Sequence, residues 1–166
     1  MIIAIISDIH DNLVNLDKCL IWCKKEKINT IICCGDVCNS DTLKFLSANF
    51  GGEIFLVDGN GETFTESDLE GLKNIKYRQE IAVEKISELT LGFCHQDRDI
   101  EKVIKKSGNL PDFIFYGHSH KPWLEKKNGM FIVNPGNISG TFFHATFAVL
   151  NTKTKNLELK IISDLI

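Results

Sequence analysis

Aspartate, histidine and asparagine residues recur in short polar segments, each directly after an apolar run of strand length. The side chains concerned are Asp8 with His10, Asp36, Asn60, His95, and His118 with His120. Four of the five histidines of the chain lie in these segments. Carboxylate, imidazole and amide groups bind divalent metals of intermediate hardness, and two metal ions need about this many ligands. The pattern therefore predicts a metal site.

Each of these residues also has a simpler interpretation when it is taken alone. Asp8 could cap the helix that begins near Leu13, and Asp36 and Asn60 could occupy ordinary turns. Five polar segments at one edge of a sheet are harder to explain in that way, and together they favour the metal site. We expect the Asp8-x-His10 and His118-x-His120 spacings to place two side chains on the same side of an extended segment. Glycines at 35, 59 and 117 are expected to allow sharp turns beneath them.

Hydrophobic periodicity indicates which elements hold these segments. Short apolar runs predict strands, and the spacing of apolar residues between them predicts helices with one buried face. The expected strands are 2–6, 30–34, 53–57, 80–86, 88–94, 112–116, 123–125, 130–133, 147–150 and 157–162, and the expected helices are 13–27, a segment capped by Asp41, and 99–106. The first third reads β-α-β-α-β, which is typical of a parallel sheet. The Asn128-Gly129 pair predicts a hairpin in the last third.

These elements predict a two-sheet α/β sandwich with helices on the outside, built as one domain over residues 1–166. Ligands of open α/β sheets bind beyond the carboxyl ends of the strands, which is where the polar segments lie. The apolar start of the chain is too short to span a membrane and lacks the features of a signal peptide. We therefore expect a cytoplasmic protein that does not bind membranes.

Charge and cysteine content exclude other classes of protein. Nineteen basic and 22 acidic side chains give a net charge of −3, which fits duplex nucleic acid poorly. None of the six cysteines are spaced as C-x-x-C, so neither a disulfide framework nor a structural zinc site is expected. Cys19, Cys23, Cys33 and Cys34 fit small buried apolar residues. Cys38 could face the metals, although we expect it to pack beneath them.

The ordered set of motifs resembles the calcineurin-like metallophosphoesterases, and the short chain resembles their small YfcE-type phosphodiesterases. The motifs are Asp8-x-His10, Gly35-Asp36, Gly59-Asn60, His95 and Gly117-His118-x-His120, and the resemblance extends to Asn134-Pro135-Gly136-Asn137. It implies an α/β/β/α sandwich of the metallophosphoesterase type. It also implies that the protein hydrolyses small phosphate esters, most of all diesters.

The resemblance further implies a division of roles among the seven residues. Asp8, His10, Asp36 and His120 would hold one metal ion, and Asp36, Asn60, His95 and His118 would hold the other. Asp36 would bridge the two ions, and a water between them would attack phosphorus. We favour manganese, with nickel, iron or zinc as alternatives, because mixed oxygen and nitrogen ligands accept all four. We expect Asn12 to contact the substrate.

Some positions depart from the family pattern, and Gly61 is the most important of them. Family members often have histidine or cysteine there, placed to assist the leaving group, whereas glycine cannot donate a proton. We therefore expect no catalytic side chain beyond the metal-bound water, and a preference for good leaving groups. His144 could reach the site as a replacement, but a surface or strand-end position is the simpler expectation. Asp11, Gln96 and Asn137 stand where glycine, glycine and serine are common.

One alternative function is protein assembly. The retromer small subunit resembles this family but serves as a scaffold with an eroded metal site. All seven proposed ligand positions here hold competent residue types, which favours the enzyme. A homodimer formed through a sheet edge or the terminal hairpins is compatible with the sequence.

Overall fold

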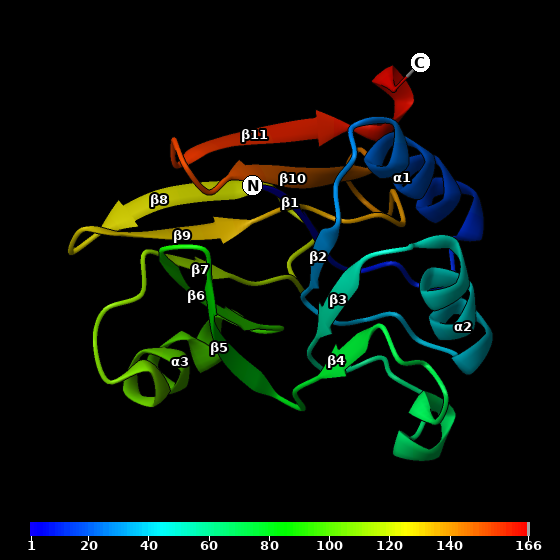
Figure 1. Cartoon of the computed structure of the whole chain (residues 1–166), viewed down its shortest axis with the longest axis horizontal. Helices are drawn as coiled ribbons and strands as arrows, with labels where there is room; N and C mark the ends of the chain where they lie inside the picture. Colours follow the sequence, from blue (N-terminus) through cyan, green and yellow to red (C-terminus); the bar gives the residue numbers. More distant parts are fainter. Residues whose placement is uncertain (166) are drawn as a thin grey trace.

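The computed structural model describes residues 1–165, which form two packed sheets with helices on both outer sides (Figure 1). The first sheet has the order β11-β10-β1-β2-β3-β4. Its strands are β1 (Ile2–Ile6), β2 (Thr30–Cys33), β3 (Glu53–Leu56), β4 (Ile75–Tyr77), β10 (Thr146–Asn151) and β11 (Asn156–Ile161). Strands β1 to β4 are parallel, and β10 pairs antiparallel with both β1 and β11. The carboxyl ends of β1, β2 and β3 consequently share one edge.

The second sheet has the order β5-β6-β7-β9-β8. Its strands are β5 (Ile81–Ile86), β6 (Leu89–Cys94), β7 (Phe113–Phe115), β8 (Trp123–Lys127) and β9 (Met130–Asn134). The central pairs β6–β7 and β7–β9 are parallel, whereas the outer pairs are hairpins. The hairpin predicted at Asn128-Gly129 is the β8–β9 pair. The parallel pairing of β6 with β7 directs the ends of these two strands toward the same side.

Three helices complete the α/β/β/α sandwich. Helices α1 (Leu13–Lys25) and α2 (Ser40–Asn49) cover the first sheet, and α3 (Ile100–Ser107) covers β5 and β6 of the second. Short 3-10 turns lie at Glu66–Leu69, Asp97–Asp99 and Ile162–Asp164. Among residues 1–165, no helix is both long and apolar enough to cross a membrane. The predicted fold class is confirmed.

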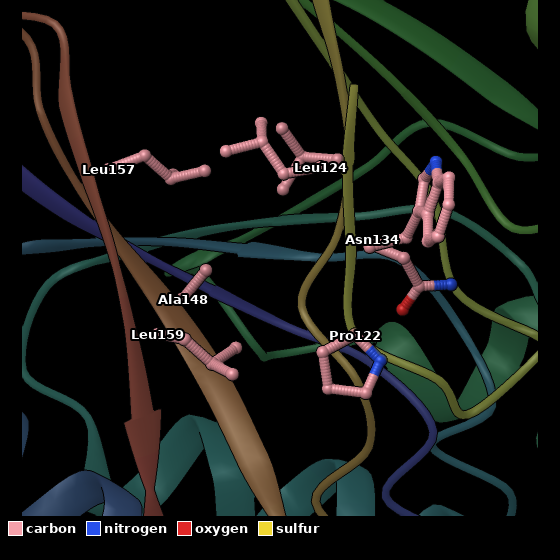
Figure 2. A pocket seen from close by; sticks show the side chains of 8 residues that line it. Pro122, Leu124, Asn134, Ala148, Leu157 and Leu159 are labelled. Atoms are coloured by element: carbon pink, nitrogen blue, oxygen red, sulfur yellow. The ribbon is translucent and has the colours of Figure 1, made fainter.

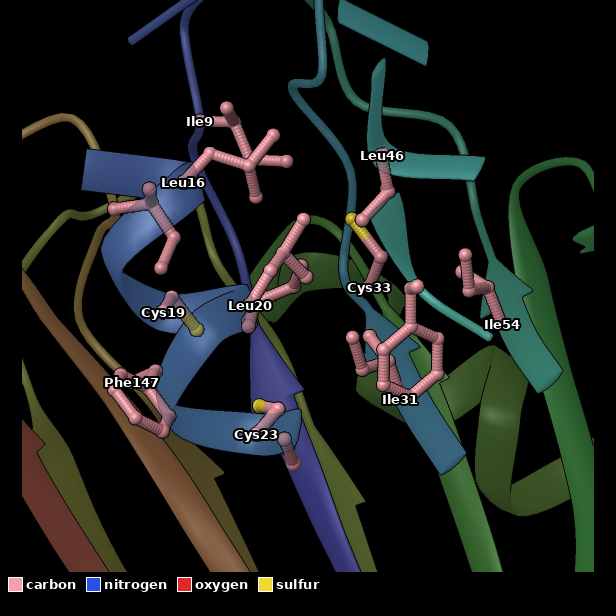
Figure 3. Close-up of a cluster of buried hydrophobic side chains, with 14 of the residues drawn as sticks. Ile9, Leu16, Cys19, Leu20, Cys23, Ile31, Cys33, Leu46, Ile54 and Phe147 are labelled. Carbon is pink, nitrogen blue, oxygen red and sulfur yellow. The ribbon is translucent and has the colours of Figure 1, made fainter. Parts of the chain in front are cut away.

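Apolar side chains fill each of the three spaces between these layers. The space between the sheets is filled by a cluster that includes Ile5, Phe93 and Phe115. A second cluster joins α1 and α2 to the first sheet and includes Cys19, Cys23 and Cys33, which lie among leucine and isoleucine side chains (Figure 3). Cys34 is also buried and free. The expectation that these four cysteines act as small apolar residues is therefore confirmed.

Two details of the predicted elements were wrong or missing. The N-cap of α2 is Asn39, whose side chain accepts a hydrogen bond from Thr42 N, and Asp41 instead lies in the first turn. Strand β4 was not predicted because its three residues carry no periodic signal. It forms by pairing with β3, with Ile75 opposite Ile54.

Candidate metal centre

The predicted residues converge where five strands of the two sheets end. Two groups of carboxylate and imidazole side chains have their ligand atoms within 4.8 Å of one another. The groups are Asp8 with His10 and His120, and Asp8 with Asp36 and His95. Asp8, Asp36 and His95 are 0%, 2% and 3% exposed, respectively. The strand ends therefore collect buried groups that could hold metal ions.

The spacing in the first group suits a metal ion. His10 Nε2 lies 3.1 Å from His120 Nε2, and His120 Nε2 lies 3.3 Å from Asp8 Oδ1. Ligand atoms about 2.1 Å from an ion lie about 3.0–3.4 Å apart at octahedral and tetrahedral angles. The donor set therefore fits a divalent ion in size and in chemistry.

The second group is arranged in the same way around His95. His95 Nε2 lies 3.0 Å from Asn60 Oδ1 and 3.3 Å from Asp36 Oδ2. The same Oδ2 atom lies 3.4 Å from His10 Nε2, so Asp36 contacts a histidine of each group. Asp8 is the carboxylate that both groups share. Two carboxylates are thus placed between the two sets of donors.

The outer nitrogens of the histidine rings fix which nitrogen faces the cluster. His95 Nδ1 donates to the carbonyl oxygen of Cys34 at 2.8 Å, so Nε2 is the nitrogen that faces the cluster and that could bind an ion once it is deprotonated. His120 Nδ1 lies 3.4 Å from Thr141 O, and His10 Nδ1 lies 3.5 Å from Cys38 Sγ. Outer partners of this kind orient histidine ligands in metal sites. Cys38 therefore contacts His10 from behind, in agreement with the expected place of this thiol.

Most of the candidate ligands have an uncommon backbone conformation. Positive φ angles occur at Asp8 (54°), His10 (45°), Asp36 (55°), His118 (65°) and His120 (59°). The left-handed region costs a residue with a side chain about 1–3 kcal/mol, and such residues cluster at functional sites. The assumption of extended segments at Asp8-x-His10 and His118-x-His120 was therefore wrong. Tight left-handed turns bring His10 and His120 toward Asp8.

Two of the three glycines serve a different purpose from the one expected. Of Gly35, Gly59 and Gly117, only Gly35 has a positive φ, of 91°. A Cβ atom on Gly59 would lie 2.0 Å from Asp36 Oδ1, and one on Gly117 would lie 1.9 Å from Ser7 Oγ and 2.6 Å from Asp8 Oδ2. Gly59 and Gly117 therefore permit the close approach of backbone to the two buried carboxylates.

Glu62 connects two of the loops that carry ligands. Its carboxylate accepts backbone N–H bonds from Cys38 at 2.7 Å, Gly59 at 3.1 Å and Val37 at 3.2 Å. The loop after β2 and the loop after β3 are thus held together beside Asp36. Burial raises the pKa of Glu62, and the three N–H groups partly offset that rise. The sequence analysis did not assign a role to Glu62, although it lies two residues after Asn60.

Carboxylates and imidazoles shift each other's pKa values in opposite directions. Burial raises the pKa of Asp8, but hydrogen bonds with His10 and His120 outweigh it and hold this pKa well below its usual range. Burial lowers the pKa of His95, yet its contact with Asp36 raises it overall. The contact with Asp8 likewise raises the pKa of His120. In the metal-free protein, the buried carboxylates therefore favour the protonated form of the neighbouring imidazoles of His95 and His120.

The remaining predicted residues, His118, Asn12 and His144, have different surroundings. The His118 ring is exposed and its centroid lies 5.2 Å from that of the His95 ring. The backbone N–H of His118 donates to both carboxylate oxygens of Asp8. The Asn12 side chain caps α1 by accepting from Asn15 N and donates to Ser139 O. His144 is exposed and makes no hydrogen bond with the described part of the chain.

The segment after β9 forms one side of the centre, and Asn137 organises it. This buried side chain donates to His120 O at 3.0 Å and accepts from the N–H groups of Gly140 and Thr141. The backbone of Ser139 donates to Asp8 O. The place of Asn137 in the Asn134-Pro135-Gly136-Asn137 motif was the only signal in the sequence for this organising role.

Comparisons with known proteins agree with this arrangement. Residues 1–155 match the family described as the calcineurin-like phosphoesterase superfamily domain. The chain is 30% identical over 161 residues to phosphodiesterase MJ0936 of Methanocaldococcus jannaschii, covering 93% of this chain and 95% of that protein.

Solved structures share the fold over nearly the whole chain. An archaeal phosphodiesterase has a TM-score of 0.85 at 24% identity, with 97% of this chain and 99% of that one covered. YfcE, a phosphoesterase from E. coli, has a TM-score of 0.71 at 20% identity, with 98% and 100% covered. Vacuolar protein sorting 29 from Cryptosporidium parvum has a TM-score of 0.68 at 20% identity, with 96% of each chain covered.

We predict that Glu62→Ala destabilises the metal-free protein by about 2–4 kcal/mol, because three backbone N–H groups lose a charged acceptor. Urea unfolding in the presence of a chelator measures this effect without a contribution from metal. Glu66→Ala, at an exposed glutamate, is the matched control and should change stability by less than about 0.5 kcal/mol. Equal stabilities of the two variants would contradict the role of Glu62.

Proposed function

We propose that this chain, which belongs to the calcineurin-like phosphoesterase superfamily, is a hydrolase that cleaves phosphodiesters with two divalent metal ions. The observation that carries the proposal is the convergence of three imidazole Nε2 atoms and two buried carboxylates at spacings of 3.1–3.4 Å. Similarity to a phosphodiesterase over almost the full chain supports the choice of diesters. We propose manganese as the metal, because the ligands mix oxygen and nitrogen donors.

Each ligand has a defined part in this proposal. Asp8, His10 and His120 hold one ion, and Asn60, His95 and His118 hold the other, with Asp36 between them. His118 would need to turn its exposed ring toward His95, which lies 5.2 Å away. When bound, the ions supply an activated water and neutralise charge on the phosphoryl oxygens. The buried carboxylates and the rings of His10, His95 and His120, each with a partner at Nδ1, keep most of this arrangement in place before the substrate arrives.

Gly61 has no side chain that could donate a proton to the leaving group. Its N–H donates to Asp36 Oδ1 at 2.7 Å, which leaves Oδ2 of the same carboxylate directed at the histidines. A Cβ atom there would lie 3.2 Å from Asp36 Oδ1 and 3.5 Å from Cys38 Sγ. Glycine therefore lets the backbone approach the carboxylate, and it contributes no group to the leaving oxygen.

The scaffold alternative rests on the shared fold alone. The similarity to vacuolar protein sorting 29 is structural, at 20% identity, and extends over the same elements as the similarity to the phosphodiesterases. All seven proposed ligand positions of this chain hold groups able to bind metal. We therefore favour the enzyme, and place it in the cytoplasm, where the free cysteines remain reduced.

We predict that removing metal abolishes hydrolysis of an aryl phosphodiester and that resupplied manganese restores it. Asp36→Asn should lower both bound metal and activity, the latter by more than about a hundredfold, because a neutral amide replaces the carboxylate that contacts both His10 and His95. Metal content by mass spectrometry and turnover by absorbance are the two measurements. Asp112→Asn, at a carboxylate paired with Lys155, is the control. Full metal content and full activity in Asp36→Asn would refute the assignment.

We predict a steep dependence of turnover on the leaving group. A positioned general acid contributes about 10²–10⁴-fold when the leaving oxygen needs a proton, and Gly61 offers none. Aryl diesters with increasingly basic phenolate leaving groups should therefore react progressively more slowly in a plot of log kcat/KM against leaving-group pKa. A flat plot would show that another group donates the proton.

A further inference from the structure

An exposed phenylalanine lies at the rim of the proposed catalytic centre. The Phe142 side chain is 89% exposed, and its ring centroid lies 6.0 Å from that of His120. Neighbouring Phe143 is 43% exposed. The Phe142 ring therefore presents an uncovered apolar face directly beside a proposed ligand, where a group of a bound substrate would meet it.

The backbone that presents this ring is held in one conformation. Phe142 has a φ of 64°, a left-handed conformation that is rare for a bulky residue. The preceding residues are tied down: the N–H groups of Gly140 and Thr141 donate to Asn137, and Asn12 donates to Ser139 O. The ring thus follows directly on a segment held by hydrogen bonds, in a backbone conformation that is costly for a bulky residue.

The opposite side of the centre has a different chemistry. A pocket of about 210 Å³ adjoins Asn60 and His95 and includes the charged side chains Glu80, Arg98 and Lys102 in its lining. Residues 139–143 carry no charged side chain. A substrate that spans the centre therefore meets an uncharged aromatic surface beyond His120 and a charged surface beyond His95.

We propose that Phe142 is a substrate-binding residue that stacks against an aromatic ring carried by one substituent of the phosphate. This inference rests on the proposed function and narrows its substrates to phosphodiesters with an aryl or heteroaryl group. Offset or tilted ring pairs with centroids 4.5–7 Å apart are favourable, and the exposed face of Phe142 is free to form one. The rigid loop reduces the loss of conformational entropy when the ring binds.

Binding of two simple phosphonates to the manganese-loaded protein tests this role. Phenylphosphonate carries the ring and methylphosphonate does not, and neither is hydrolysed. Phe142→Ala should weaken binding of phenylphosphonate by about three- to tenfold and leave methylphosphonate unchanged. Phe142→Trp should retain the preference for the phenyl compound. Leu110→Ala, which removes another exposed apolar side chain, is the matched control.

Binding is measured by calorimetry, and the result separates a failure of the role of Phe142 from a failure of the proposed function. If the wild-type protein binds methylphosphonate but Phe142→Ala affects the two ligands equally, the role of Phe142 is refuted and the proposed function stands. If the loaded wild-type protein binds neither phosphonate, the phosphoesterase centre itself is contradicted, and the inference falls with it.

A separate set of observations concerns β11, one of the two edge strands of the first sheet. The Leu157 and Leu159 side chains line an apolar pocket with Leu124 of β8 and Ala148 of β10 (Figure 2). Leu159 is 48% exposed and Ile161 is 36% exposed. An exposed edge strand with an apolar face is a template for pairing with another strand.

The hydrogen-bonding groups of this edge are directed outward at alternate residues. Ile162 N–H donates to Ala145 O, and β10 pairs with β11 so that Thr146 lies opposite Ile161. Since bonded and non-bonded pairs alternate in antiparallel strands, residues 158 and 160 bond back to β10. The backbone groups of Leu157, Leu159 and Ile161 therefore point toward the free edge.

We also infer that a second copy of this chain pairs here, β11 against β11, around a twofold axis at Leu159. In this register Leu159 faces its own copy, and Leu157 faces Ile161 of the other chain. Glu158 then lies beside Lys160 of the other chain, so opposite charges meet twice. Antiparallel pairs of this kind are favourable, and the Leu159 N–H and C=O groups are oriented to bond across the axis.

Sedimentation and cross-linking test the pairing. The wild-type chain should sediment with twice the mass of one chain, and Glu158→Lys should weaken the dimer about tenfold by placing lysines side by side. The double variant Glu158→Lys with Lys160→Glu should restore it. Leu159→Cys should form a disulfide-linked dimer, with the wild-type protein as control, whose single partly exposed cysteine is Cys38. A wild-type monomer, or a dimer that none of these changes affects, would overturn the inference.

Discussion

The left-handed backbone at Asp8, His10, Asp36 and His120 is the constraint on which the rest of the centre depends. Each of these residues would gain free energy by relaxing to an ordinary conformation, and relaxation would turn its side chain away from the others. The surrounding structure must therefore hold all four at once. Glu62 does so for the loops after β2 and β3, and backbone bonds between the Asp8 and Asp36 segments do so for the loop after β1. The two-sheet core supplies the rigid strand ends to which these loops attach.

Attraction between carboxylates and imidazoles stabilises the same loop arrangement as these hydrogen bonds. Asp8 and Asp36 are buried, and a buried carboxylate is costly unless a positive charge or N–H groups accompany it. Here the histidines lower the pKa of both carboxylates, while the carboxylates raise the pKa of His95 and His120. The metal-free centre is thus stabilised by the same side chains that are suited to bind ions. Metal ions that enter it must displace protons from imidazole, which couples binding to pH.

The sequence predicted the elements and the ligand types better than the local geometry. Strand and helix positions follow from apolar periodicity, a property of residues that are close in the chain, so β1 and α1 were predicted nearly to the residue. Strand β4 depends on its partner β3, and the capping role of Asn39 depends on where the chain enters α2, so neither could be inferred from local pattern. The left-handed turns at Asp8 and His118 were missed because their cost is offset by contacts with distant segments. The roles of Glu62 and Asn137 in holding the loops were missed for the same reason.

Asymmetry around the centre follows from how the strands end. The loops after β1, β2 and β3 supply ligands and are tied to one another by backbone hydrogen bonds and by Glu62. The segments after β6 and β9 also carry groups that extend past the ligands, with Arg98 on one side and Phe142 on the other. In the proposed enzyme, the tied loops that hold the ligands determine what reaction the centre can perform, whereas Arg98 and Phe142 determine which substituents on phosphorus it can accommodate. Because these two side chains are exposed, they can change at little cost to the core, which separates substrate choice from the chemistry of the centre.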